Sequence, residues 1–167
     1  MTDWVYDIET YPNCFTMIIG SAETSESHIF EISDRRDDSM AMRRFLGRLY
    51  KNKDRMVGFN NIGFDYPVVH QFLKDRNTTY QDLYQKAQDI IDSFKDDRFK
   101  HRVPPKKIFI EQVDLFLIHH FDNGARSTSL KMLEFNMRSN NIEDLPFPVG
   151  TELSDAQKDV LIEYNKQ

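Results

Sequence analysis

Two carboxylates near the start of the chain have a spacing suited to metal binding or acid–base chemistry. Asp7 and Glu9 lie two positions apart in the segment DWVYDIET. Alternate side chains of a β-strand point to the same face, so the Cα atoms of this pair would lie roughly 6.5 to 7 Å apart. The neighbours Val5, Tyr6 and Ile8 indicate a central strand, where charged groups are costly unless paired or bound to a cation. A strand end with both acids in water is the alternative, and D-x-E alone leaves both open.

A third carboxylate, Asp65, lies in the segment GFNNIGFDYP, residues 58–67. The pattern predicts a strand that runs into an Asn/Gly turn and then into a helix with proline in its first turn. Asp65 is therefore expected near a helix start, beside the end of a strand. In isolation it suits an ordinary helix N-cap. Its position after D-x-E favours a shared carboxylate site.

A tyrosine in the last predicted helix completes the set. Ser154 and Gln157 have the S-x-x-Q form of a capping box, which predicts a helix from residue 155 to the end. Tyr164 lies in this helix close to Val160 and Leu161. A helical tyrosine in such surroundings is typical of a core residue, so Tyr164 gains meaning only together with the carboxylates.

In this order, the three segments resemble the tyrosine branch of the DEDD superfamily of 3′-5′ exonucleases. The matches are D-I-E-T at 7–10, N-x-x-x-F-D at 60–65 and Y-N-K-Q at 164–167. Asp114-Leu115 after a strand and Ser129-Leu130-Lys131 at a helix start are similar to the middle section of this family. The resemblance covers essentially the whole chain and is strongest to the N-terminal proofreading domain of a DNA polymerase, with a phage enzyme as the expected source.

The resemblance implies a two-metal-ion hydrolase. Asp7, Glu9 and Asp65 would hold two Mg²⁺ or Mn²⁺ ions with the help of one more aspartate, and Tyr164 would orient the attacking water. Two ions about 3.5 to 4 Å apart activate that water and stabilise the leaving 3′ oxygen. Oxygen ligands suit cations that must also bind phosphate and water.

The resemblance also implies a substrate and a set of contacts to it. The expected substrate is the 3′ end of single-stranded DNA. Contacts are expected from residues beside the metal ligands, namely Thr10, Asn60, Asn61, Phe64 and Tyr66. A polymerase domain in cis is the expected partner. Two alternatives stay open: a non-catalytic RNase H-like module that binds single-stranded nucleic acid, and a stand-alone RNA exonuclease.

The chain departs from the family pattern at its end. The pattern is Y-x-x-x-D, and four residues after Tyr164 is the position directly after Gln167. Because four residues are about one helical turn, that aspartate would share the face of Tyr164. Asp159 and Glu163 fall on other faces of the helix. We expect an N-terminal part of a longer polymerase, ending within its last helix, with activity below that of a four-carboxylate site.

The remaining pattern predicts an α/β fold. Three closely spaced strands at 4–8, 14–20 and 28–32 indicate an antiparallel meander, followed by shorter strands at 55–59 and 107–113. Apolar residues at helical spacing predict helices over 42–50, 67–73, 83–94 and 129–137. Strands interleaved with helices are compatible with an RNase H-like mixed β-sheet flanked by α-helices.

Composition sets broader limits. The 167 residues suit a single domain, and the formal net charge of −5 argues against binding nucleic acid mainly through a broad basic surface. The single cysteine, Cys14, excludes an internal disulfide. No segment reaches the roughly 20 apolar residues of a membrane span, so we expect a cytoplasmic protein, in the host cytoplasm if phage-encoded. The dense basic run at 98–107 is typical of a solvated loop, but it could also follow a single-stranded backbone, with Phe99 stacking on a base.

Overall fold

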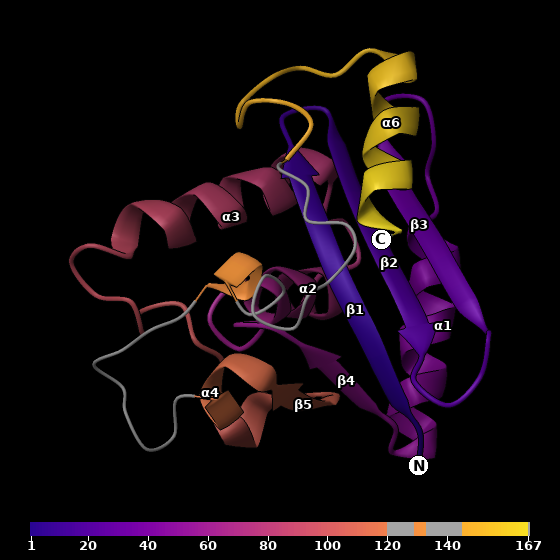
Figure 1. Ribbon diagram of the computed structural model, residues 1–167, viewed down its shortest axis with the longest axis vertical. Coiled ribbons are helices and arrows are strands. Elements are labelled where there is room, and N and C mark those ends of the chain that lie inside the picture. Colours follow the sequence, from indigo (N-terminus) through magenta and orange to yellow (C-terminus); the bar gives the residue numbers. More distant parts are fainter. Residues whose placement is uncertain (120–128, 133–144, 167) are drawn as a thin grey trace.

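The computed structural model describes residues 1–119, 129–132 and 145–166. Within them, five strands form one mixed sheet in the order β3-β2-β1-β4-β5 (Figure 1). β1 (Asp3–Tyr11), β2 (Cys14–Ser21) and β3 (Ser27–Ser33) form the expected antiparallel meander. β4 (Arg55–Gly58) and β5 (Glu111–Asp114) extend the sheet in parallel to β1. The predicted mixed sheet flanked by helices is confirmed.

The helices lie on both faces of this sheet. α1 (Ser39–Asn52), α2 (Asp65–Lys74) and α3 (Tyr80–Ser93) pack on one face, and α6 (Asp155–Asn165) packs on the other (Figure 1). Two short helical segments, η1 (Pro105–Lys107) and α4 (Leu115–His119), flank β5. None of the helices in the described residues is long and apolar enough to cross a bilayer.

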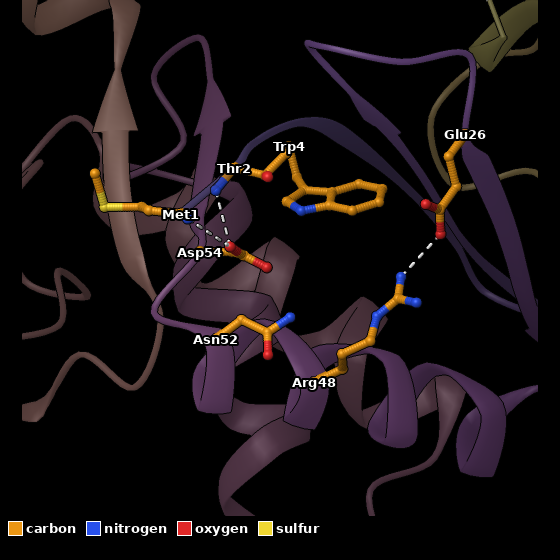
Figure 2. Close-up of a pocket in the computed structure, with 7 residues that line it drawn as sticks. All are labelled: Met1, Thr2, Trp4, Glu26, Arg48, Asn52 and Asp54. Atoms are coloured by element: carbon orange, nitrogen blue, oxygen red, sulfur yellow. Dashed lines mark hydrogen bonds and ion pairs between the residues drawn. The ribbon is translucent and has the colours of Figure 1, made fainter.

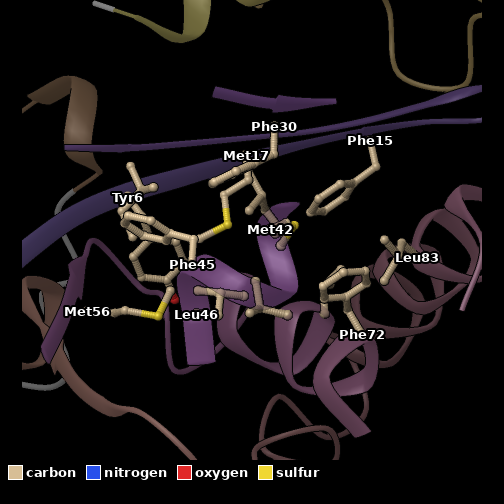
Figure 3. Close-up of a cluster of buried hydrophobic side chains, with 14 of the residues drawn as sticks. Tyr6, Phe15, Met17, Phe30, Met42, Phe45, Leu46, Met56, Phe72 and Leu83 are labelled. Carbon is tan, nitrogen blue, oxygen red and sulfur yellow. The ribbon is translucent and has the colours of Figure 1, made fainter. Parts of the chain in front are cut away.

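The larger hydrophobic core fills the space between the sheet and the first three helices (Figure 3). Side chains alternate along β1, so Trp4, Tyr6 and Ile8 point into this core. From α1 the core takes Met42, Phe45, Leu46 and Leu49, at the predicted helical spacing. The opposite face of β1 therefore carries Val5, Asp7, Glu9 and Tyr11.

A smaller core forms on that opposite face. Tyr11 and Cys14, at the turn between β1 and β2, pack against Leu153 and Leu161. The predicted capping box is present, because Ser154 accepts the N–H of Gln157 and the Gln157 side chain accepts the N–H of Ser154. α6 is thus placed over the end of β1 that carries Glu9 and Tyr11.

Ion pairs hold α6 to the edge of the sheet. The Arg35 guanidinium donates to both oxygens of Glu31 at 2.7 and 2.9 Å, and reaches Asp159 of α6 at 2.8 Å. Burial alone would raise the pKa of Glu31, but the hydrogen bonds from Arg35 and Ser33 outweigh it and hold that pKa below its ordinary value. Asp159 therefore serves in docking α6, in agreement with its expected place away from the face of Tyr164.

The sequence predictions were wrong about the start of one strand and about the burial of three side chains near helix ends. The strand expected over 107–113 is confined to Glu111–Asp114, because residues 105–107 form a 3-10 turn. Ile91 and Phe94 complete the apolar stripe of α3 in the sequence but are 46% and 57% exposed. Tyr50 of α1 is also exposed. Of the helix expected over 129–137, only 129–132 belongs to the described residues.

The buried ion pair provides a test of how α6 is held. Arg35→Ala would leave the Glu31 carboxylate, 1% exposed, without its cation. Loss of one partner of a buried pair should lower the free energy of unfolding by about 3 kcal/mol. Arg36→Ala is the matched control, since Arg36 pairs with Asp38 at the surface, and it should change stability by less than about 1 kcal/mol. Urea unfolding of both variants measures this, and equal small losses would contradict the role of the pair.

Candidate active site

Asp7 and Glu9 lie on β1 just beyond the part of this strand that pairs with β4. The register joins Asp3, Trp4 and Val5 to β4 and ends there. Both acids stay paired through their backbones to β2, Asp7 opposite Ile18 and Glu9 opposite Thr16. Asp7 is exposed and Glu9 is half-buried. The two carboxyl groups thus stand on the face of the sheet opposite the large core.

Asp65 reaches the same region from the end of β4. After Gly58 the chain turns sharply, and a Cβ on Gly58 would lie 2.9 Å from the Cβ of Asn61, so the turn requires glycine there. Asn60 adopts a left-handed conformation, with φ of 58°. Asp65 is the first residue of α2 and is 8% exposed, whereas the N-cap is Phe64. The alternative of an ordinary N-cap aspartate does not hold.

Asp114 fixes this turn, a role that the sequence did not reveal. Its carboxylate accepts the backbone N–H groups of Asn60 at 2.8 Å and Ile62 at 3.1 Å. It also accepts the N–H of Phe116 at 3.0 Å, at the start of α4. Asp114 ends β5, opposite Gly58 in the parallel ladder, and is 5% exposed. It positions the turn before Asp65, and the only sequence signal for it was an acid directly after a predicted strand.

Two of the five residues expected to contact substrate are buried. Asn61 donates to Gln112 at 2.9 Å, and the same Gln112 oxygen accepts the Tyr6 hydroxyl at 3.0 Å. The Tyr66 hydroxyl accepts the N–H of Phe109 at 2.8 Å. Asn61 is 0% exposed and Tyr66 is 1% exposed. Their hydrogen bonds connect the turn to Gln112 of β5 and α2 to Phe109, which lies just before β5.

The other three expected contact residues, Thr10, Asn60 and Phe64, are half-buried. Their side chains therefore retain some access to solvent. Direct contact of any of the five with a substrate stays a prediction.

The three carboxyl groups act on one another electrostatically. Burial, followed by the charges of Asp7 and Asp65, raises the pKa of Glu9 to about 8. The side chain of Asp7 is still reached by solvent, but many protein atoms lie around its carboxyl group. This burial raises the pKa of Asp7 to about 6. Burial and then the charge of Asp7 raise the pKa of Asp65 well above its ordinary value. The charges of Asp7 and Asp65 thus act on Glu9, and the charge of Asp7 acts on Asp65. That the three carboxyl groups form one shared site stays a prediction.

The backbone N–H of Ile8 adds to this picture. It lowers the pKa of both Asp7 and Asp65, in part offsetting the effect of burial. A single N–H affects two carboxyl groups only if both lie near it. Among the described residues, none of the three acids forms a salt bridge with a cation.

Tyr164 lies near the same end of β1. Burial, followed by the charges of Glu9 and Tyr164, raises the pKa of Tyr11 to about 12. The Tyr11 hydroxyl donates to the backbone oxygen of Phe147 at 2.9 Å. Glu9 and Tyr164 therefore both lie close enough to Tyr11 to act on it, and Tyr11 packs against Leu161 of the helix that carries Tyr164.

Within the described ranges, no three His, Cys, Asp or Glu side chains are already arranged as a ligand set for one metal ion. The donor chemistry nevertheless fits a hard divalent cation, because all three groups present oxygen and repel one another. A pocket of about 440 Å³ lies elsewhere, at the N-terminal end of β1, lined by Met1, Thr2, Trp4, Glu26, Arg48, Asn52 and Asp54 (Figure 2). It contains none of the predicted site residues.

Comparisons with known proteins give a structural similarity only. No protein-family model matches the sequence, and no curated protein matches it significantly. The fold is similar to the family B DNA polymerase from the hyperthermophilic archaeon Pyrobaculum calidifontis, with a TM-score of 0.56 and 19% identity over 99% of this chain. E. coli exonuclease I in complex with an oligonucleotide matches with a TM-score of 0.44 and 17% identity over 86% of this chain. The chain spans 23% of the polymerase and 36% of the exonuclease chain.

The raised pKa of Glu9 predicts how stability depends on pH. With a chelator present, the folded state holds a proton on Glu9 up to about pH 8, whereas an unfolded glutamate releases it near pH 4.5. The folded state then binds more protons, so stability falls as pH rises between these values. Glu9→Gln should therefore gain stability over the wild type progressively from about pH 4.5 to about pH 8, above which the difference should level off.

Unfolding by urea across this range measures the difference. Glu23→Gln, in the exposed turn between β2 and β3, is the control and should show no such trend. A constant difference between Glu9→Gln and the wild type at all pH values would contradict the electrostatic coupling at the site.

Proposed function

We propose that this chain is a 3′-5′ exonuclease domain that hydrolyses the terminal phosphodiester bond at the 3′ end of single-stranded DNA. The proposal is supported by the position of Asp7 and Glu9 on one face of β1 and by the effect of the Asp7 charge on Asp65 at the start of α2, without a compensating cation among the described residues. Carboxylates kept together at such a cost are typical of catalytic sites.

Asp7, Glu9 and Asp65 are the residues that would hold divalent cations, Mg²⁺ or Mn²⁺, two in number by the family resemblance. Such ions supply a nucleophilic hydroxide near neutral pH and neutralise charge on the leaving oxygen. Deprotonated carboxylates are needed to bind a cation, so the raised pKa values of Asp7 and Glu9 make binding favour higher pH.

The other residues of the site bind and orient. Tyr164 is proposed to orient the attacking water, since α6 carries it to the Glu9 end of β1. Thr10, Asn60 and Phe64 are proposed to contact the terminal nucleotide, while Asn61 and Tyr66 hold the turn and α2 in place. Asp114 acts through Asn60 and Ile62 and is a positioning residue.

The structural comparison supports a polymerase context for this proposal. The similarity to a family B DNA polymerase extends over 99% of this chain but only 23% of that enzyme. We therefore propose that the exonuclease domain works together with a polymerase domain in cis, as a proofreading unit of a phage-type enzyme. The identity is too low to transfer more than the fold.

Removal of a single carboxylate tests the enzymatic proposal. Asp7→Ala should reduce Mg²⁺- or Mn²⁺-dependent degradation of a 3′-labelled DNA oligonucleotide by at least about 100-fold, or roughly 2.7 kcal/mol of transition-state stabilisation. Binding of the same oligonucleotide in EDTA should survive. Asp92→Ala, an exposed carboxylate on α3, is the control and should cleave like the wild type.

The same assay separates the alternatives. Binding without metal-dependent cleavage by the wild type would point to a non-catalytic single-strand-binding module. Faster digestion of RNA than of a DNA oligonucleotide of the same sequence would point to an RNA exonuclease. Cleavage that persists in Asp7→Ala would refute the assignment of the site.

The family pattern adds a second prediction about ligands. The family pattern Y-x-x-x-D has an aspartate four residues after Tyr164, the position that one aspartate added directly after Gln167 would take. We expect this addition to raise the rate of 3′-end degradation at least about tenfold, a gain of roughly 1.4 kcal/mol. The control is an added asparagine, which has the same shape but no charge. Equal rates for the two extended chains would contradict the need for a fourth carboxylate.

A further inference from the structure

A group of cations lies between α3 and β5. The segment from Lys95 to Lys107 carries six lysines and arginines against two aspartates, Asp96 and Asp97. None of the six forms a salt bridge with any described residue: Lys95, Arg98, Lys100, Arg102, Lys106 and Lys107. Several cations elsewhere in the described chain do pair with carboxylates, among them Arg35, Arg36, Arg48, Arg55 and Lys158. In a chain with a net charge of −5, unpaired cations gathered on one short segment leave a local positive field available to an external anion.

Two of these arginines are held by an aromatic ring. The guanidinium carbons of Arg98 and Arg102 lie 4.7 and 4.4 Å from the centroid of the Phe99 ring. Arg102 Nε is buried and has no acceptor in the described part of the chain. A guanidinium stacked on a ring keeps its planar set of N–H donors free for a bidentate acceptor such as phosphate. The Phe99 ring therefore packs against both arginines, and the stacking of this ring on a base stays a prediction.

Lysine side chains of α2 and α3 add positive charge beside this segment. Lys86 of α3 contacts His101, with 2.9 Å between Nζ and Nδ1. Burial, and then the charges of Lys74, Lys107 and Lys86, lower the pKa of His70 on α2. Several like charges therefore face one region between α2, α3 and the segment, with Asp89 as a partial counterweight to Lys86 and His101.

The segment is connected by hydrogen bonds to α2, the helix that begins with Asp65. Its end is tied to the first turn of α2, since Phe109 and Ile110 donate their N–H groups to the Tyr66 hydroxyl at 2.8 and 3.4 Å. Tyr66 follows Asp65 in the chain. The charge of Asp114 also acts on Arg102, partly offsetting the burial that lowers the pKa of this arginine. A strand of nucleic acid that leaves the carboxylates along this side would therefore meet the cations.

We propose that Arg98, Arg102, Lys106 and Lys107 form a basic surface that binds the phosphodiester backbone of the single-stranded DNA whose 3′ end enters the carboxylate site. The inference rests on the proposed function and extends it by naming the surface that holds the rest of the strand. We assign the contacts to phosphates, because arginine and lysine side chains are frequent hydrogen-bond donors to phosphate oxygens and such contacts carry no sequence information. The surface adds affinity for longer strands without preference for sequence.

The test compares two double variants of equal charge change. Arg98→Gln with Arg102→Gln removes two cations from the basic surface, and Arg44→Gln with Lys51→Gln removes two exposed, unpaired cations from α1, which packs beside β3. Binding of a fluorescent oligothymidylate of about 15 nucleotides is measured by anisotropy in EDTA at several salt concentrations. Metal is absent, so the measurement does not depend on catalysis.

The basic-surface variant should lose about tenfold in affinity. The slope of log K against log salt should become shallower by about 1.4, since each lost phosphate contact removes about 0.7. With Mg²⁺ present, KM for the oligonucleotide should rise while kcat changes little. The α1 variant should keep the wild-type affinity and slope. Lys106→Gln with Lys107→Gln serves as a second variant, with the same expectation, should the arginine variant fold poorly.

Three results would overturn the inference. Equal loss of affinity in the basic-surface and α1 variants would mean that only net charge matters. Competition by polyglutamate as effective as that by DNA of equal charge would assign the surface to an acidic polypeptide. Absence of any salt-dependent DNA binding by the wild type would remove the ligand. By contrast, binding as described without 3′-end degradation would refute the proposed function and leave this inference standing.

Discussion

The candidate site depends on one local constraint, the capture of two backbone N–H groups by the Asp114 carboxylate. Asn60 and Ile62 donate to it across the end of the parallel ladder between β4 and β5. This contact fixes a turn that includes a left-handed residue and a close approach at Gly58. Because α2 begins only three residues after Ile62, the turn determines where Asp65 lies. A shift of this turn would move Asp65 relative to Asp7. The pairing of Gly58 with Asp114 and the hydrogen bond from Asn61 to Gln112 hold the same turn.

Much of the framework could be predicted because its signals are local. The meander and the capping box of α6 depend on residues within a few positions of one another, and both are confirmed. The role of Asp114 could not be predicted, because its partners lie 54 and 52 positions away. Tyr66 illustrates the same limit. The sequence placed it beside Asp65, but only the fold reveals that its hydroxyl is used by Phe109.

Charged side chains form ion pairs in one part of this acidic chain, whereas in another part some of them form none with any described residue. At β3 and α6 the charges are satisfied internally, as in the pairs of Arg35 with Glu31 and Lys158 with Asp34. In the part of the chain that the structure describes, by contrast, Asp7 and Glu9 form no salt bridge, and neither do Arg98 and Arg102. Pairing stabilises a docked helix, whereas separated charges of both signs suit the binding of a phosphate chain together with cations.

Keeping the carboxyl groups near one another, without a cation between them, lowers the stability of the folded protein. Folding brings together carboxyl groups whose ionised forms are opposed by burial and by one another, so the folded state near neutral pH holds them at the expense of stability. A core that packs three helices on one face of the sheet supplies the opposing stabilisation. Relief of the repulsion is then available to any bound cation, so binding and stability are linked at the same three residues. The repulsion lowers the stability of the protein without cations and raises its affinity for them. This balance is expected where acids serve a reaction rather than the fold.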